Sequence, residues 1–441
     1  MGIYSFVDCE YDYYACVVSK AENCLKEQDK AILVEIVEPG KREISLDSFE
    51  EFRTLIQTLD LEIVAETTQI IKQPNYAFFI GKGKLNEIKQ IVKLLEPKYV
   101  FINTTLTYLQ LKNISTEIGV PCIDRAHLIL MIFSMRAKTR EGKLQIELSE
   151  LKMRLPDIVH NEKFLDQQVG SELGLKGPGE KKIEVRRRFV ERRIKVLEKK
   201  LLVIGKQREL RRKRRRKNNI PIIAIVGYTN SGKSMLLNRI TLSKAYVENM
   251  LFSTLDTLVR KGSLNDDTEA LFVDTIGFIR DFPHPLIYAF HSTLEEVLDA
   301  WIILHVVDVS VPDFREKIDS VGETLLELKA SHIPRILIFN KTDKISDEKL
   351  LQYKNLFKEA VFISALNGEG INDLKDRIRK ELSLLFIRHT ILVPYTEQNI
   401  LAMAYKETRV LERRDGEDGV YLTIEGFKGN MEKFKQFFVF P

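Results

Sequence analysis

Residues 221–234 read PIIAIVGYTNSGKS, an apolar run that passes directly into a glycine-rich loop. The part from 227 to 234 fits the pattern GxxxxGK[ST], and the helix-like run SMLLNRI overlaps its end. In a strand–loop–helix of this kind, backbone amides surround phosphate oxygens, the lysine neutralises their charge and the serine hydroxyl can ligate Mg²⁺. The helix that starts at about Lys233 adds its positive dipole end. The segment therefore predicts a site for a nucleoside phosphate in an α/β domain.

Three shorter motifs follow in order, each at the end of an apolar, strand-like run. DTIG begins with Asp274, whose carboxylate can hold a Mg²⁺-bound water, and ends with Gly277, whose amide can reach a γ-phosphate. NKTD ends with Asp343, which can accept hydrogen bonds from both N1–H and N2–H₂ of guanine, a pair that adenine lacks. SAL, at 364–366, offers backbone amides to guanine O6. The four motifs together predict a site for guanine nucleotides.

Other residues near these motifs have narrower expected roles. Asn340 is placed to brace the loop and the base, and the aliphatic stem of Lys341 can lie over the purine face. A switch GTPase also needs a threonine in a mobile loop that closes over Mg²⁺ and the γ-phosphate. The run FSTLDT, residues 252–257, provides Thr254 as the first choice and Thr257 as the second.

The residue that follows DTIG departs from the common pattern. Many GTPases carry a glutamine there that orients the attacking water. Here the position is Phe278, which neither donates nor accepts a hydrogen bond. We therefore expect slow intrinsic hydrolysis that a partner stimulates, with backbone groups, a cation or a residue from elsewhere as the catalytic group. Asn230, in the phosphate loop, is compatible with a nearby potassium ion and equally with a loop-bracing role.

Upstream of the phosphate loop the pattern predicts two further regions, preceded by residues 1–30, which show no clear period. Residues 31–125 alternate between strand-like and amphipathic helical runs, as a small parallel α/β domain does. The strands are expected at 31–38, 62–69 and 99–103, and the helices at 47–59, 84–95 and 106–118. Residues 126–217 predict an antiparallel helical hairpin, because apolar residues spaced three and four apart form two narrow seams. Its tip is the glycine-rich run VGSELGLKGPGE, and its second helix extends from about 180 to 217.

Downstream, residues 218–388 predict a GTPase domain with a mostly parallel sheet, and residues 389–441 a small α+β domain. The strands of the larger domain are expected at 221–227, 271–273, 301–307, 335–340 and 361–363. The last region should contain a strand at 390–394, a helix at 397–405, a hairpin and a final helix. The hairpin turn is RRDGEDGV, in which Gly416 and Gly419 are expected to supply the turn conformation.

Composition excludes several classes of protein. The chain has 441 residues, 44% hydrophobic and 30% charged, which suits two to four globular domains. No apolar run approaches the roughly 18 residues that a bilayer span needs, and the N-terminus lacks the pattern of a secretory signal. The four cysteines lack the spacing of metal ligands, which argues against a zinc site or a disulfide scaffold; they are Cys9, Cys16, Cys24 and Cys122. We expect a soluble, cytosolic protein.

One segment is strongly basic. Residues 176–217 contain twenty Lys and Arg against five Asp and Glu, although the whole chain carries a net charge of only +5. A charge run is usually a solvated helix face, but acidic partners for pairing along the helix are scarce after Glu198. We interpret the run as an RNA-binding arm with a salt-sensitive affinity. The glycine loop at 170–179 either enters a tight RNA site or simply joins the helices.

At this point the motifs resemble those of a known family, the HflX GTPases. The resemblance is carried by GYTNSGKS, LFSTLD, NKTD and the long DTIGFIRDFPHPLIYAFHSTLEEV, and upstream by GKGKLNEI and GPGEKKIEVRRR. It spans about residues 30–385 and implies a ribosome-associated GTPase that binds GTP and GDP with Mg²⁺. It also implies that the N-terminal domain and the hairpin touch the large (50S) ribosomal subunit and its rRNA. Members of the family are linked to splitting or rescue of ribosomes. We expect a monomer that is cytoplasmic or peripheral to the membrane.

The resemblance implies a full set of site residues. The nucleotide contacts are Gly227, Tyr228, Thr229, Asn230, Ser231, Gly232, Lys233, Ser234, Phe252, Ser253, Thr254, Leu255, Asp256, Asp274, Thr275, Ile276, Gly277, Asn340, Lys341, Thr342, Asp343, Ser364, Ala365 and Leu366. Lys233, Thr254 and Gly277 are the expected catalytic residues, and Ser234 and Thr254 the expected Mg²⁺ ligands. The arginines expected to bind RNA are Arg186, Arg187, Arg188, Arg192, Arg193, Arg211, Arg212, Arg214, Arg215 and Arg216.

Two other functions fit the same motifs. In the first, the GTPase acts on a structured RNA during assembly or modification. In the second, the protein is an adaptor that binds a nucleotide to hold one conformation and rarely hydrolyses it. Stimulated turnover separates the adaptor from the enzyme, and cosedimentation with mature rather than precursor subunits separates splitting from assembly. We find no second phosphate loop that would support ATP use by the N-terminal domain.

Overall fold

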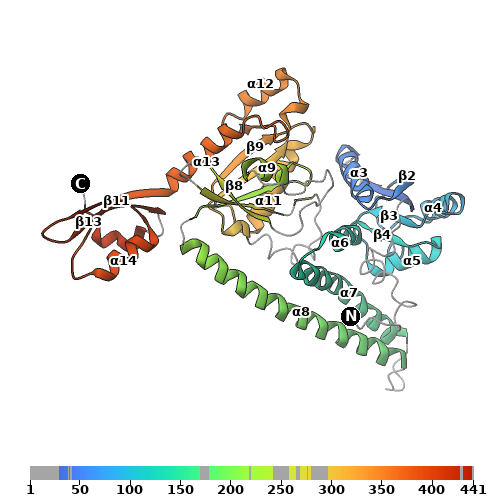
Figure 1. The fold of residues 1–441 in the computed structure, drawn as a ribbon. Helices are drawn as coiled ribbons and strands as arrows, with labels where there is room; N and C mark the ends of the chain where they lie inside the picture. The colour runs from blue at the N-terminus through green and yellow to red at the C-terminus, as the bar shows by residue number, and fades with distance from the viewer. Residues whose placement is uncertain are drawn as a thin grey trace. The chain divides into compact units, whose positions relative to one another are not determined.

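The computed structural model describes residues 29–37, 39, 42–168, 178–217, 220–241, 258–264, 269–275, 277–279, 296–427 and 431–439. The chain divides into two compact units. The first consists of Met1–Val203 with the segments Glu248–Asp256 and Ile279–Ser292, and the second of the rest of the chain from Ile204 onward. Figure 1 labels their helices and strands. None of the helices in these ranges has the length and apolar character that crossing a membrane requires.

A parallel sheet with the strand order β2-β1-β3-β4 forms the core of the first unit. Its strands are β1 (Lys30–Val37), β2 (Glu62–Ile70), β3 (Tyr99–Asn103) and β4 (Cys122–Asp124). Parallel strands need crossover connections, and α3 (Arg42–Gln57), α4 (Lys82–Leu95) and α5 (Tyr108–Ile118) lie in them. The apolar faces of α4 and α5 pack with strand side chains in one buried cluster that includes Ile32, Ile88 and Ile114. The predicted α/β domain is confirmed.

The structure adds one helix to this layer and moves the start of the three predicted ones. α4 begins at Lys82 rather than 84. α3 begins at Arg42 rather than 47, and α5 begins at Tyr108 rather than 106, because Thr107 caps it through the amide of Gln110. α6 (Arg125–Arg136) was not predicted. Its apolar residues are buried on every side, so it lacks the one-sided pattern that reveals a surface helix. It packs against α3, β3 and β4.

A buried polar network links the carboxyl ends of β1 and β3 to the start of α6. Arg125 donates to Asn103 Oδ1 and to Glu51 Oε1, each at 2.8 Å. The Asn103 amide donates in turn to Glu35 Oε2 at 2.7 Å. Glu35, Asn103 and Arg125 are all buried. Charged groups at this depth need one another as partners, so the network joins four separate elements, β1, α3, β3 and α6.

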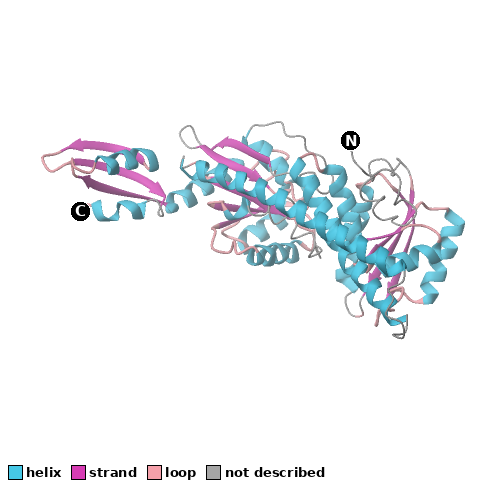
Figure 2. Ribbon diagram, turned by 90° about the horizontal axis from the view of Figure 1, so that it is seen from below, coloured by secondary structure: helices cyan, strands magenta, loops and turns pink. Residues whose placement is uncertain are grey.

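Two long helices, α7 (Arg140–Gln168) and α8 (Pro178–Lys217), form the predicted hairpin. Figure 1 shows them side by side, and Figure 2 distinguishes helices from strands by colour. The leucine seams meet in one cluster, whose buried members are Leu148, Leu151, Val190, Ile194 and Leu197. Two ion pairs cross between the helices, from Arg193 to Glu147 at 2.6 Å and from Lys152 to Glu198 at 2.9 Å. Only residues 218–221 separate the end of α8 from the next strand, β5 (Ile222–Gly227).

The second unit contains a six-stranded sheet with the order β10-β9-β8-β5-β7-β6. The parallel strands are β5, β7 (Glu269–Asp274), β8 (Ile302–Asp308), β9 (Arg335–Asn340) and β10 (Val361–Phe362), as predicted within two residues. β6 (Leu258–Ser263) pairs antiparallel with β7 and was not predicted. The helices of this layer are α9 (Lys233–Thr241), α11 (Phe314–Glu327), α12 (Asp347–Leu356) and α13 (Ile371–Leu385). The carboxyl ends of parallel strands meet at one edge of a sheet, and all four nucleotide motifs lie there.

The last region is a three-stranded antiparallel sheet with the order β11-β13-β12. It comprises β11 (Phe386–Val393), α14 (Gln398–Glu407), β12 (Arg409–Asp415) and β13 (Val420–Phe427). The hairpin is confirmed, but only one glycine has a left-handed conformation, Gly419 with φ +149°. At Gly416 the constraint is space, because a Cβ there would lie 2.9 Å from the ring of Tyr421. The final helix is a 3₁₀ helix, η2 (Glu432–Phe437).

Candidate nucleotide-binding site

The phosphate loop joins β5 to α9, and its two chemically important side chains are buried. Lys233 and Ser234 open α9 with exposed fractions of 6% and 8%. The ammonium of Lys233 donates to the carbonyl of Tyr228 at 2.7 Å. Gly232 has φ +93°, and a Cβ at this position would lie 2.2 Å from Asn340 Nδ2. The loop therefore requires glycine at this point, and it already has the cradle form that suits phosphate.

Ser234 and Asp274 bring two oxygen donors together below the loop. The Ser234 hydroxyl donates to Asp274 Oδ2 at 2.7 Å, and both residues are buried. The register of β5 and β7, which pairs Ile225 with Asp274, produces this closeness. Oxygen ligands of this kind are the ones that Mg²⁺ prefers. The donor set therefore fits a magnesium ion.

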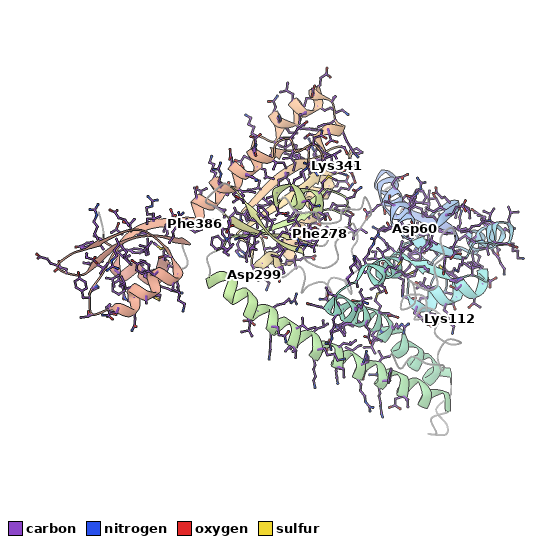
Figure 3. The ribbon with its side chains drawn as sticks, in the orientation of Figure 1. Asp60, Lys112, Phe278, Asp299, Lys341 and Phe386 are labelled. Carbon is purple, nitrogen blue, oxygen red and sulfur yellow. The ribbon has the colours of Figure 1, made fainter. Side chains whose placement is uncertain are left out.

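The segment after DTIG lies against the phosphate loop through its backbone. Thr229 N–H donates to the carbonyl of Phe278 at 2.7 Å, and Phe278 N–H donates to the carbonyl of Gly227 at 3.1 Å. The Phe278 ring, labelled in Figure 3, is 8% exposed and belongs to an apolar cluster with Tyr228 and Val297. Gly277 is equally constrained, because a Cβ would lie 2.8 Å from Thr229 Cγ2 and 3.0 Å from Lys233 Nζ. Phe278 therefore contributes core packing and backbone hydrogen bonds, and its side chain has no polar group that could orient a water molecule.

NKTD and SAL, the motifs predicted to recognise the base, are joined to the phosphate loop by Asn340. Its amide donates to the carbonyl of Ser231 at 2.8 Å, and its Oδ1 accepts from the amide of Ala365 at 3.0 Å. The Ser364 hydroxyl donates to Asp343 Oδ1 at 2.5 Å and so orients that carboxylate. Together with the bond from Ser234 to Asp274, these contacts join all four motifs in one hydrogen-bonded assembly.

Two residues of this assembly were missed by the sequence analysis. Asp308, at the end of β8, holds the ammonium of Lys341 at 2.7 Å, and Lys341 itself has an uncommon φ of +65°. Arg239, in the last turn of α9, donates from Nε to the carbonyl of Ala365 at 3.0 Å and from Nη2 to that of Leu366. An acidic residue that ends a strand-like run is a usable signal for Asp308. No local pattern marks Arg239, because its partners lie 126 and 127 residues away in the sequence.

The other predicted contacts divide into three groups. The Thr275 hydroxyl donates to the carbonyl of Ile225 at 2.8 Å inside the fold, so this side chain anchors DTIG. Thr342 is buried, and its N–H donates to the carbonyl of Ile363 at 3.3 Å, whereas Leu366 and Asn230 are exposed. The remaining positions lie outside the described residues; they are Phe252, Ser253, Thr254, Leu255, Asp256, Thr257 and Ile276.

Burial shifts two pKa values in this domain. Burial lowers the pKa of Lys233 from 10.5 to about 8, with Asp274 opposing the shift and Lys341 adding to it. Burial likewise lowers the pKa of His305, on β8, from 6.5 to about 3, with smaller contributions from the charges of Arg335 and Lys233. Both groups are therefore more easily deprotonated than in an unfolded chain.

The basic arm is only partly described. Arg187 pairs with Glu191 at 2.9 Å and Arg188 with Glu184 at 2.5 Å, both along α8, while Arg193 pairs across the hairpin. Arg192 is exposed. These pairs partly neutralise the middle of the arm. For several predicted RNA-binding residues of α8 the structure describes the backbone and not the side chain; they are Arg186, Arg211, Arg212, Arg214, Arg215 and Arg216.

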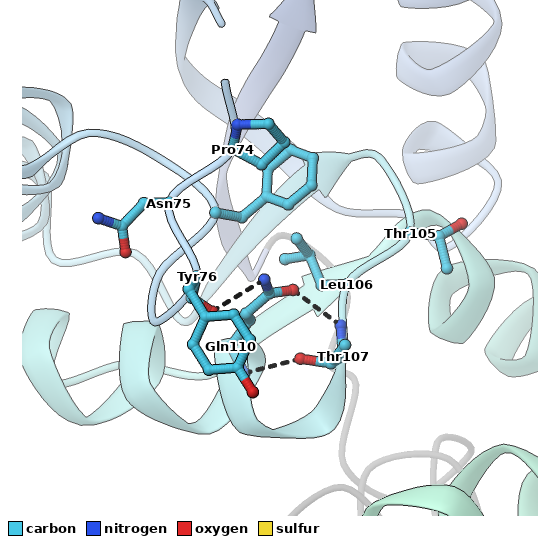
Figure 4. Close-up of a pocket in the computed structure, with 8 residues that line it drawn as sticks. Pro74, Asn75, Tyr76, Thr105, Leu106, Thr107 and Gln110 are labelled. Atoms are coloured by element: carbon cyan, nitrogen blue, oxygen red, sulfur yellow. Dashed lines mark hydrogen bonds between the residues drawn. The ribbon is translucent and has the colours of Figure 1, made fainter. Parts of the chain in front are cut away.

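The first unit contains a separate hollow of about 440 Å³ at the carboxyl end of its sheet. Figure 4 shows that it lies between the segment after β2 and the start of α5. Gln110 Nε2 donates to the carbonyl of Tyr76 at 3.2 Å, and the Thr107 amide donates to Gln110 Oε1 at 3.0 Å. The Tyr76 ring is 69% exposed at its rim. None of the residues that line this hollow belongs to the predicted nucleotide site.

Four family models match the chain in succession. They are described as GTP-binding GTPase N-terminal for residues 46–134, GTP-binding GTPase middle region for 136–215, 50S ribosome-binding GTPase for 222–341 and HflX C-terminal domain for 349–428. Their order follows the order of the structural regions. A solved GTP-binding protein from the archaeon Sulfolobus solfataricus, in complex with GDP, is 28% identical; it covers 81% of this chain and 100% of its own, with a TM-score of 0.44.

Curated relatives match almost the whole chain. The GTPase HflX of Caldanaerobacter subterraneus is 40% identical over 418 residues, which cover 95% of this chain and 96% of that protein. The GTPase HflX of Escherichia coli is 35% identical over 393 residues, which cover 89% of this chain and 92% of that protein. With this identity across all four regions and an assembled guanine-nucleotide site, the chain belongs to the HflX family of GTPases.

Proposed function

We propose that this GTPase binds the large ribosomal subunit and its rRNA when it carries GTP, splits or rescues ribosomes, and leaves the subunit after hydrolysis. The match of residues 222–341 to a 50S ribosome-binding GTPase is the observation that carries the proposal. We also propose that the chain consists of five regions, with boundaries at residues 30, 125, 217 and 388. We propose further that it acts as a monomer in the cytoplasm. A location peripheral to the membrane has no support among the described residues.

The phosphate end of the site supplies charge and orientation. Lys233 neutralises charge on the phosphates, and the amides of the loop surround their oxygens. Ser234 and Thr254 would hold Mg²⁺, and Asp274 would hold it through a water. The ion would supply positive charge that offsets the negative charge developing on the phosphates during hydrolysis. The Gly277 amide donates to the γ-phosphate and thereby couples its presence to the conformation of the switch.

The base end of the site selects guanine. Asp343, oriented by Ser364, accepts from N1–H and N2–H₂. The Lys341 stem covers the purine face while Asp308 holds its ammonium in place. The loop at 364–366 donates an amide to O6. Adenine would leave Asp343 and this amide without partners, and unpaired buried polar groups are costly.

Hydrolysis depends on a group that Phe278 does not supply. Its ring is packed in the core of the domain, so it cannot orient the attacking water. The nearby backbone positions the water, and the partner provides the remaining catalytic group. Slow turnover without the subunit and fast turnover on it follow from this arrangement. A potassium ion beside Asn230 is a further candidate for the missing positive charge.

The test measures GTP hydrolysis by the purified chain with and without large subunits, at two salt concentrations. We expect strong stimulation that weakens at the higher salt, because contacts with phosphate release counterions. A variant with glutamine at Arg211, Arg212, Arg214, Arg215 and Arg216 should lose most of the stimulation. A control variant with glutamine at two arginines outside the arm, Arg413 and Arg414, which pair with Asp415 and Glu412, should keep it.

The outcomes separate the competing functions. GTP binding without stimulation would contradict the ribosome-triggered enzyme and favour a nucleotide-gated RNA adaptor. Cosedimentation with precursor particles, and not with mature subunits, would favour assembly over splitting. Equal rates in sodium and potassium buffers would remove the potassium ion from the mechanism.

A further inference from the structure

We propose that Arg239 is a positioning residue for guanine recognition, which fixes from α9 the direction of the amide that meets the 6-oxo group of the base. The proposal rests on the guanine site proposed above and adds to it a specificity-determining residue outside the four motifs. Arg239 has no expected contact with the nucleotide itself. It acts through the backbone of the loop at 364–366.

Two hydrogen bonds carry the argument. Arg239 Nε donates to the carbonyl of Ala365 at 3.0 Å, and Arg239 Nη2 donates to the carbonyl of Leu366. Both bonds have a charged donor, which makes them stronger than bonds between neutral groups. The planar guanidinium carries its donors in a fixed fork, so one side chain orients two successive carbonyls.

The geometry of the peptide group passes this orientation to the base. A carbonyl and the following N–H belong to one planar trans unit and point in opposite directions. Because the Ala365 carbonyl is directed at Arg239, the Leu366 N–H points away from Arg239. The preceding amide, that of Ala365, is already held by Asn340 Oδ1 at 3.0 Å. A donor that is fixed in advance loses no further freedom when the 6-oxo group arrives.

The rest of the loop is held at other points, which leaves Arg239 a distinct contribution. Ser364 N–H donates to the carbonyl of Glu369 at 3.1 Å, and Gly368 N–H donates to that of Ser364 at 2.7 Å. These bonds close the turn on itself. Arg239 instead joins the turn to α9, the helix that opens with Lys233 and Ser234. The phosphate and base halves of the site thereby share one support.

The test replaces Arg239 by methionine, which keeps the length of the side chain and removes its donors. Binding is measured by displacement of a fluorescent GDP analogue, once with GDP and once with the 5′-diphosphate of 2-aminopurine riboside, which lacks the 6-oxo group. We expect the Kd of GDP to rise about tenfold and that of the 2-aminopurine nucleotide to change by less than about twofold. An equal loss for both nucleotides would overturn the positioning role, because general damage to the domain weakens both.

Two further variants complete the experiment. Arg239→Lys keeps one donor group near the loop and should restore part of the discrimination. Arg377→Met on α13 removes an arginine that pairs with Glu381 at 2.9 Å on its own helix, and it should leave both affinities unchanged. Failure of the unmodified chain to bind GDP at all would instead contradict the proposed nucleotide site. The two failures are therefore distinguishable.

Discussion

Lys233 lies at the start of α9, and burial lowers its pKa from 10.5 to about 8. Above pH 8 the free site therefore holds mainly neutral lysine, whereas bound phosphate favours the charged form. We expect GDP binding to take up almost no proton at pH 7 and roughly half to one proton at pH 9. Calorimetry in buffers of different ionisation enthalpy measures this uptake. The same uptake at both pH values would show that Lys233 keeps an ordinary pKa.

His305 makes the stability of the GTPase domain fall as the pH is lowered. Burial lowers its pKa from 6.5 to about 3, so between these values the unfolded chain binds a proton that the folded chain excludes. Stability from His305 is complete above pH 6.5 and falls as the pH drops toward 3. At pH 4.5 the expected cost is about 2–3 kcal/mol relative to pH 7.

The measurement for His305 is urea unfolding followed through the fluorescence of Trp301, the single tryptophan, which lies one residue before β8. His305→Leu should flatten the decline of stability between pH 6.5 and 4.5. The exposed His332 is the control, and His332→Leu should leave the decline as it is. An unchanged slope in His305→Leu would mean that other groups cause the acid sensitivity.

At the scale of elements, the buried network at the start of α6 should contribute strongly to the free energy of unfolding. Arg125→Met removes the donor from Glu51 and Asn103, whose polar groups then stay buried without it. Breaking a buried charged pair in this way costs about 3–5 kcal/mol. Hydrogen exchange at the amides of β1 and β3 measures the loss.

The control for this network is Arg53→Met. Arg53 pairs with Glu66 and Glu50 at the surface, with 30% of its side chain exposed. Exposed pairs contribute at most about 1 kcal/mol, so exchange at β1 and β3 should change little. Equal effects of the two substitutions would contradict the importance assigned to burial.

Elements with one buried face were predictable from the sequence, and those without one were not. α4 and α5 follow the apolar period closely, and β9 was predicted at its exact bounds. α6 is buried on all sides, so its sequence has no polar stripe to mark helical turns. β6 is an edge strand with the mostly polar sequence LVRKGS and partly exposed side chains, which resembles a loop.

The site shows the same limit in a different form. Lys233, Asp274 and Asp343 could be predicted because short motifs fix their spacing and their chemistry. Arg239 could not, since its contacts depend on how α9 and the loop after β10 meet in the folded domain. Hydrogen bonds between segments that are distant in sequence produce no periodic pattern in either segment. A single sequence therefore reveals the groups that touch the nucleotide more readily than those that hold them.

Across the whole molecule, charge is unevenly distributed along the chain. The segment 176–217 is strongly basic, and the remaining residues are acidic on balance. The acidic remainder repels polyanions elsewhere on the surface, so an RNA should be bound through this arm. The binding should weaken steeply with salt.

The short connection between α8 and β5 affects how firmly the chain would stay bound to an RNA. From Lys217 to Ile222 the chain spans at most about 18 Å. Once RNA holds the arm, the GTPase domain is confined near the same RNA at a high effective concentration. Inserting twenty Gly and Ser residues between α8 and β5 should reduce subunit-stimulated turnover several-fold and leave GDP affinity unchanged. Unaltered stimulation would mean that the two contacts act independently.

The same confinement also determines how the chain would dissociate from the RNA. Two tethered contacts hold jointly far more strongly than either holds alone, because each returns the other to its site after a brief separation. Weakening one of them is then enough to shorten the lifetime of the whole attachment. If the arm binds RNA as proposed, hydrolysis at the nucleotide site would therefore release it without any change at its arginines.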